Sequence, residues 1–150
     1  LSHTEAVGRL GAGIQVISTG RDTNGNYCSD KTLSTCTSLE GMKLETIDAI
    51  NNFNVLCRQA NPNCSVTITG GTEIGHTAGD NSHAAGYKFD ASYGNTEFNN
   101  YVIRLITTQN RISETQNIQS NQTYRIRLNN GRNIDVRYET NPSHWDFRVI

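Results

Sequence analysis

Two stretches of the chain carry apolar residues three or four positions apart, the spacing of a helix that buries one face. The first spans residues 38–60, ends before Pro62, and has its apolar stripe at Leu44, Ile47, Ile50, Phe53 and Leu56. The second spans residues 96–106, follows Asn95 as a candidate N-cap, and carries Phe98, Tyr101, Val102 and Leu105. The pattern therefore predicts two amphipathic helices.

Elsewhere the apolar residues alternate with polar ones, as in strands with one buried face. Short runs of this kind occupy residues 13–17, 65–69 and 86–90. Residues 124–128 and 134–138 alternate on either side of Asn130-Gly131, a dipeptide typical of hairpin turns, and residues 145–149 predict a last strand. Residues 20–37 and 71–86 are predicted loops. This order of elements predicts an α+β fold with a mostly antiparallel sheet.

Composition limits the kind of molecule. A length of 150 residues fits one domain, so we expect a single domain over residues 1–150, with 1–37 as an N-terminal extension and loop. The net charge of −1 argues against nucleic-acid binding, and no apolar run approaches the roughly 20 residues of a membrane span. The chain begins at Leu1 and shows no signal peptide, so we expect a mature or excised domain. We also expect a monomer.

Four arginines gather in the predicted C-terminal hairpin: Arg125, Arg127, Arg132 and Arg137. One interpretation is a set of solvated side chains on an exposed hairpin. The other is a site for an anionic ligand or polymer. The sequence leaves both open.

The four cysteines are Cys28, Cys36, Cys57 and Cys64, and their spacing is not that of the CxxC pairs of a structural zinc site. An even number in a small polar domain predicts two disulfides and an oxidising, extracytoplasmic compartment. Three pairings are possible. We favour Cys28–Cys36 with Cys57–Cys64 because both loops are short, and four buried thiols in a cytosolic protein is the alternative.

A potential metal site is formed by His83 and Asp90, the latter at the end of a predicted strand. Both side chains suit zinc, and a catalytic zinc site has three protein ligands and one open position. His144 is the candidate third ligand. On a strand it would face away from its neighbour Trp145, so the indole could pack into the core while the imidazole faces a cleft.

Residues 82–90, SHAAGYKFD, resemble the His-x-x-Gly-x-Ala-x-Asp signature of the D-Ala-D-Ala carboxypeptidase and L-Ala-D-Glu endopeptidase family. That family shares its zinc fold with the hedgehog signalling domain. VTITGG resembles the strand before the first-ligand loop, and NPSHWDF resembles the family's Glu-Pro-Trp-His-Trp ending. The likeness covers about residues 40–150, and we expect a hedgehog-like sheet with helices on one side.

The resemblance implies a zinc ion held by His83, Asp90 and His144, and a water that cleaves peptidoglycan stem peptides as a carboxypeptidase or an endopeptidase. It implies an extracytoplasmic location: periplasmic, secreted, or within a phage or conjugation assembly. Two other interpretations stay open. One is a non-catalytic zinc module that binds cell wall or protein. The other is a metal-free domain stapled by disulfides.

The sequence departs from the family at the catalytic glutamate, three positions before His144, where Asn141 stands. Glu139, the nearest acid, is the first candidate for the general base. Asp146 is the second, because it shares a strand face with His144. Lys88 replaces the alanine of the signature.

The family's arginine after the preceding strand is also missing, since residues 69–73 read TGGTE. His76 is our candidate for its replacement, as a donor that stabilises the oxyanion. Two alternatives for His76 are a fourth zinc ligand, which would close the site, and an ordinary loop histidine.

Overall fold

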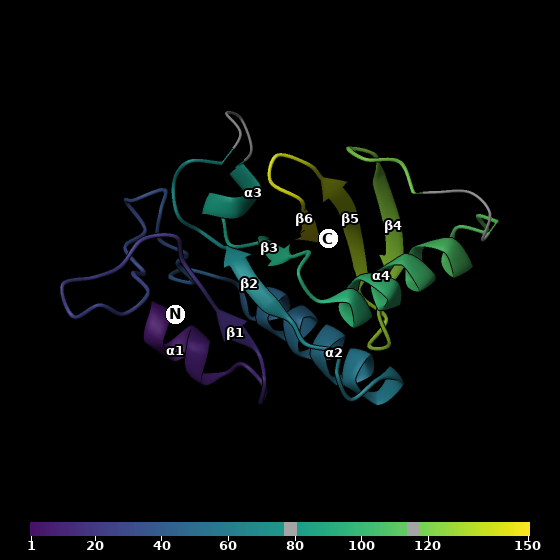
Figure 1. Cartoon of the computed structure of the whole chain (residues 1–150), viewed down its shortest axis with the longest axis horizontal. Coiled ribbons are helices and arrows are strands. Elements are labelled where there is room, and N and C mark those ends of the chain that lie inside the picture. Colours follow the sequence, from purple (N-terminus) through teal and green to yellow (C-terminus); the bar gives the residue numbers. More distant parts are fainter. Residues whose placement is uncertain (77–80, 114–117) are drawn as a thin grey trace.

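The computed structural model describes residues 1–76, 81–113 and 118–150, without the side chains of residues 81 and 82. The helices are α1 (His3–Gly8), α2 (Leu44–Ala60), α3 (Asn81–Ala84) and α4 (Thr96–Gln109). The strands are β1 (Gln15–Val16), β2 (Thr67–Gly70), β3 (Lys88–Ser92), β4 (Thr123–Arg127), β5 (Asn133–Glu139) and β6 (His144–Val149). Figure 1 shows their arrangement.

The strands form one mixed sheet in the order β1-β2-β3-β6-β5-β4. The β1–β2 pair is parallel and the other pairs are antiparallel. The predicted α+β class with a mostly antiparallel sheet is therefore confirmed. The predicted hairpin is also present, with Gly131 in its turn at a φ of 86°.

Both predicted helices form, with two boundaries different from the prediction, since the second helix ends at Gln109 instead of residue 106. The first begins at Leu44 instead of residue 38, because Gly41 adopts a φ of 78° and interrupts the helical path. Leu44 is consequently 50% exposed, outside the buried stripe. The second helix begins as predicted, with the Asn95 side chain accepting a hydrogen bond from the Phe98 amide at 2.8 Å.

Phe147 on β6 identifies the buried face of the sheet. Its ring lies 4.8 Å from that of Phe53 on α2 and 6.2 Å from that of Phe98 on α4. The two long helices therefore cover the same face. Trp145 is buried beside them, and its indole N–H donates to Asn99 Oδ1 at 2.9 Å, so the predicted orientation of this tryptophan is confirmed.

The opposite face is polar and carries the candidate site. Asp90 on β3 is the register partner of Asp146 on β6, which in turn pairs with Arg137 on β5. In the next row Ser92, His144 and Glu139 are aligned in the same way. The short helix α3 lies on this side, since its His83 approaches both aspartates, so the expectation of helices on one side only is wrong.

Two disulfides join Cys28 to Cys36 and Cys57 to Cys64, which confirms the favoured local pairing. The second ties the last turn of α2 to the segment leading into β2. Helix α1 was not predicted, although Ser2 and Glu5 form a capping box at its start. No helix in the described part of the chain is long and apolar enough to cross a membrane.

Candidate metal centre

His83 is buried, with 2% of its surface exposed. Its Nδ1 lies 2.8 Å from the Gly71 carbonyl oxygen, which can only accept, so Nδ1 carries the proton. Nε2, the other ring nitrogen, lies 3.6 Å from Asp90 Oδ1 and 3.9 Å from Asp146 Oδ2. Burial lowers the pKa of His83, but the contact with Asp146 and the charge of Asp90 outweigh it, and the pKa is raised.

Gly86, three positions after His83, occupies a place in the chain that only glycine fits. It ends the turn after α3 with a φ of 87°, and a Cβ there would clash with the Gly41 carbonyl oxygen. Its own carbonyl accepts from Thr46 Oγ1 at 2.7 Å and from the Lys43 amide at 3.1 Å. These contacts connect the His83 turn to the start of α2 and hold it over the sheet.

Asp90 has a buried carboxylate oxygen, Oδ1, that has no hydrogen-bond partner. Burial, opposed by the charge of His83 and reinforced by that of Asp146, raises the pKa of Asp90 to about 6. A buried carboxylate oxygen without a partner, 3.6 Å from an imidazole nitrogen, is unfavourable unless a proton or a metal ion lies between the two atoms. The atom is therefore a marker of a site for a proton or a metal.

His76 is the second histidine that approaches Asp90. Its Nε2 lies 2.6 Å from Glu73 Oε2, and its Nδ1 lies 3.8 Å from Asp90 Oδ2. Glu73 is itself fixed, because it accepts from the backbone amides of Ser38 and Gly71. Burial raises the pKa of Glu73, but the contact with His76 and these amides outweigh it and lower the pKa.

The residues His76, His83 and Asp90 form a group whose potential ligand atoms all lie within 4.8 Å of one another. The two imidazole rings stack with their centroids 3.5 Å apart and their planes 2° apart. Each ring has one nitrogen held by a carboxylate or a carbonyl and the other turned toward Asp90. This is the outer-shell arrangement of metal-binding histidines, and the donor set fits zinc.

His144 lines the same pocket as this group but is not one of its three members. The pocket has a volume of about 350 Å³. Nδ1 of His144 donates to the Pro142 carbonyl at 2.7 Å, and Nε2 lies 3.2 Å from Glu139 Oε1. Like the other two imidazoles, that of His144 has one ring nitrogen held by an oxygen of the protein. Its second nitrogen lies next to Glu139. Its role as third ligand stays a prediction.

Asp146 also lines this pocket, on the same strand face as His144. Its Oδ2 forms an ion pair with Lys88 Nζ at 3.0 Å. Burial raises the pKa of Asp146, but His83 and Lys88 outweigh it and lower the pKa to about 2. A carboxylate of such low pKa is a weak proton acceptor at neutral pH.

The pocket therefore gathers every predicted catalytic and metal-binding side chain: His76, His83, Asp90, Glu139, His144 and Asp146. Sequence reasoning missed Glu73 and the Gly71 carbonyl, which orient the two stacked histidines. An acid three positions before a histidine in a loop was the available signal for Glu73.

No protein-family model matches this chain, and neither the curated proteins nor the solved structures contain a significant match.

Proposed function

We propose that the chain is a zinc-dependent peptidase that cleaves peptidoglycan stem peptides outside the cytoplasm. One observation supports the metal: Asp90 Oδ1, buried and without a hydrogen-bond partner, lies 3.6 Å from His83 Nε2. A cation between these atoms satisfies both. The peptide substrate is supported by the likeness of residues 82–90 and 141–147 to the carboxypeptidase and endopeptidase family. The two disulfides fit an oxidising compartment.

The proposed ligands are His83, Asp90 and His144, which leave one coordination position open. His144 Nε2 would exchange its contact with Glu139 for the metal. This exchange frees the Glu139 carboxylate, which lines the same pocket, for proton transfer.

When bound, zinc polarises a peptide carbonyl and lowers the pKa of water. Glu139 is the proposed general base: its carboxylate accepts the proton of the attacking water and delivers it to the leaving amine. The low pKa of Asp146 favours Glu139 over Asp146 in this role. His76, oriented by the contact of its Nε2 with Glu73, is the proposed donor to the developing oxyanion from Nδ1.

The test uses purified protein and a muropeptide with an intact stem peptide. We expect about one zinc per chain by elemental analysis, and new amino groups or free D-Ala that disappear on chelation and return with zinc. Glu139→Gln should keep the zinc and lose about 10²–10⁴-fold in rate. Arg104→Gln, an exposed change on α4, is the matched control. Undiminished hydrolysis after zinc removal would overturn the proposal.

A second candidate is a non-catalytic zinc module that binds cell wall or protein. It is favoured by the position of His76 in the group with His83 and Asp90. With His144 added, four protein ligands would fill a tetrahedral site and leave no open position. X-ray absorption of the zinc protein separates the two, since three histidines at the metal with peptidoglycan binding but no hydrolysis would identify the module.

A further inference from the structure

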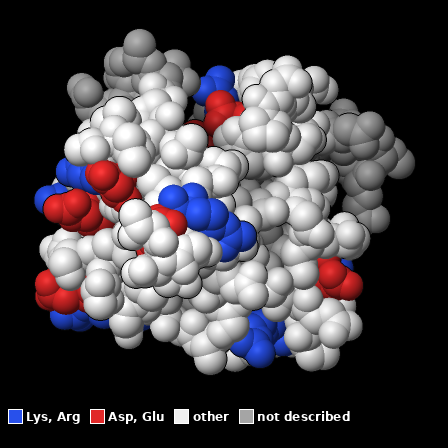
Figure 2. Space-filling view, turned by 60° about the vertical axis from the view of Figure 1, so that its left-hand side comes forward, with Lys and Arg blue, Asp and Glu red and all other residues white. Residues whose placement is uncertain are grey.

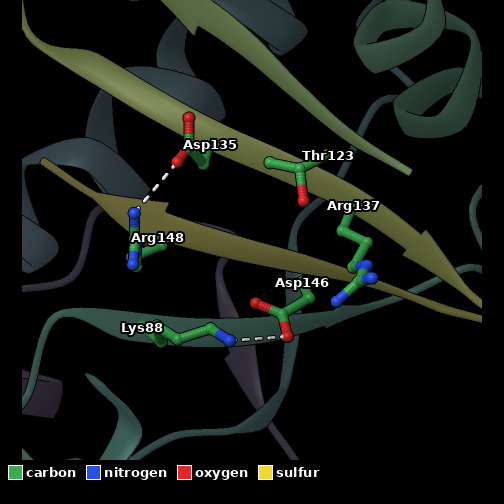
Figure 3. Close-up of a pocket in the computed structure, with 6 residues that line it drawn as sticks. All are labelled: Lys88, Thr123, Asp135, Arg137, Asp146 and Arg148. Atoms are coloured by element: carbon green, nitrogen blue, oxygen red, sulfur yellow. Dashed lines mark hydrogen bonds and ion pairs between the residues drawn. The ribbon is translucent and has the colours of Figure 1, made fainter. Parts of the chain in front are cut away.

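A charged groove adjoins the candidate metal centre on the polar face of the sheet. Its volume is about 190 Å³. Figure 3 shows its lining side chains, which are Lys88, Thr123, Asp135, Arg137, Asp146 and Arg148. Asp146 lines both the groove and the metal-site pocket. A substrate held at the metal can therefore extend into this groove.

Both carboxylates of the groove are already engaged. Asp146 Oδ2 pairs with Lys88 Nζ at 3.0 Å. Asp135 pairs with two arginines, through Oδ2 with Arg148 Nη2 at 3.1 Å and through Oδ1 with Arg125 Nε at 3.0 Å. The cations around the groove outnumber its carboxylates, so its field favours an anion.

Arg137 is the cation whose contacts are with a neutral group. Its Nε and Nη2 donate to the Asn121 carbonyl at 3.0 Å and 2.6 Å. No ion pair within the described ranges involves Arg137. The two bonds to one oxygen fix the plane of the guanidinium. They leave Nη1 without a hydrogen-bond partner among the described residues. Figure 3 shows this group extending toward Asp146, without a dashed line to either carboxylate.

We propose that Arg137 binds a carboxylate of the substrate and so sets the class of peptide that the site accepts; this inference rests on the proposed function. A guanidinium already oriented by a backbone carbonyl loses little freedom when it receives an oxyanion. Lys88 and Arg148 add positive charge to the same groove. The anion is either the C-terminal α-carboxylate or an acidic side chain close to the scissile bond.

The register places this anion near the reacting bond. Asp90, Asp146 and Arg137 are aligned across β3, β6 and β5. Two strand spacings separate the first and third by about 10 Å. A peptide advances about 3.3–3.6 Å per residue, and the ligand and arginine side chains bridge part of the gap. The carboxylate therefore belongs one or two residues from the scissile carbonyl.

Binding of three probes to zinc-loaded and metal-free protein tests the inference without requiring turnover. The probes are N-acetyl-D-Ala-D-Ala, its C-terminal amide, and the amide of N-acetyl-D-Ala-D-Glu with a free side chain. We expect at least one carboxylate probe to bind about tenfold more tightly than the neutral amide, the size of one charge-assisted interaction. The carboxylate that confers the gain identifies the source.

The Arg137→Gln variant should lose this preference and keep its affinity for the neutral amide, whereas Arg137→Lys should keep part of it. Arg104→Gln on α4 is the matched control and should behave as wild type. Equal binding of all three probes to the wild-type protein would overturn the inference, even if Arg137→Gln failed to fold. A carboxylate preference without hydrolysis or zinc would contradict the proposed function and leave the Arg137 subsite standing.

Discussion

Asp90 and Asp146 are direct register partners on β3 and β6, and the pKa values of their carboxyl groups are displaced in opposite directions. Burial raises the pKa of Asp90 to about 6. Burial also opposes ionisation of Asp146, but His83 and Lys88 overcome it and bring that pKa to about 2. The charge of Asp146 is therefore balanced by His83 and Lys88, whereas Asp90 lacks a cation that would balance its charge.

Replacing Asp90 should have opposite effects on stability without and with zinc. In the metal-free protein the raised pKa means that folding favours the protonated form, so this contribution is complete below pH 3.8 and is lost as the pH rises through about 6. The free energy of unfolding of metal-free Asp90→Asn should therefore exceed that of the wild type by about 2–3 kcal/mol at pH 8, with the difference shrinking toward pH 4. Urea unfolding at both pH values measures it.

With saturating zinc the wild type should be more stable than Asp90→Asn. Zinc stabilises the folded state to which it binds, and the variant has lost one of the atoms that would hold the metal. The same urea series with added zinc is the comparison. An Asp90→Asn variant that stays the more stable protein in zinc would contradict the assignment of Asp90 as a ligand.

The histidines of the pocket should separate by function. His144→Ala is expected to weaken zinc binding by more than 100-fold, beyond the 10–100-fold typical of outer-shell changes, and to abolish hydrolysis. His76→Ala is expected to change zinc affinity less than tenfold while slowing hydrolysis by about 10²-fold, as for loss of an oxyanion donor. Competition with a chromogenic chelator measures the affinity. The reverse pattern would make His76 the third ligand.

Asp146 should stabilise the protein most at neutral pH. Its lowered pKa means that the contribution is present above pH 3.8 and is lost as the pH falls toward 2. Asp146→Asn is therefore expected to cost about 2–4 kcal/mol at pH 7 and less at pH 3. The exposed Asp48→Asn change on α2 should cost less than about 0.5 kcal/mol. A deficit that does not vary with pH would show that the charge of Asp146 is unimportant.

Each disulfide closes a short loop, with sequence separations of 8 and 7 residues. Loop-closure entropy of this size corresponds to about 2–3 kcal/mol. The double change Cys57→Ser with Cys64→Ser should lower the free energy of unfolding by this amount in guanidinium titrations. Reduction of the wild-type protein should lower it by more, because both bridges are lost. An unchanged midpoint would show that the bridge contributes nothing.

The elements that alternation and helical spacing encode were predictable. Period two identified β4, β5 and β6, and from it the shared face of His144 and Asp146 follows. The contact of His76 with Glu73 was not predictable, because it depends on the path of an irregular loop held by backbone hydrogen bonds to residue 38. Neither the alternation of a strand nor the three-to-four-residue spacing of a helix describes the path of such a loop.

The two short helices were not predicted for a related reason. Helices α1 and α3 are too short to show an apolar stripe, so only their capping and turn residues mark them. The N-terminal extension contains α1, which was not predicted, and β1, which lies within the strand predicted over residues 13–17. The pairing of its β1 with β2 is a non-local contact that composition does not reveal.

Figure 2 shows one side of the molecule, on which basic and acidic atoms are interspersed and no continuous basic stripe is visible. Among the arginines of the hairpin, Arg125 forms an ion pair with Asp135, and Arg137 lines the groove. Binding of an anionic ligand by this cluster stays a prediction.

The division of the sheet into an apolar and a polar side gives the molecule two nearly independent sets of positions. Residues such as Phe89 and Phe147 determine whether the chain folds, while their immediate neighbours along the same strands face solvent and the pocket. Mutational libraries restricted to the outward rows should therefore alter recognition while most members remain folded. A scaffold organised in this way is suited to the evolution, or the laboratory redesign, of new specificities.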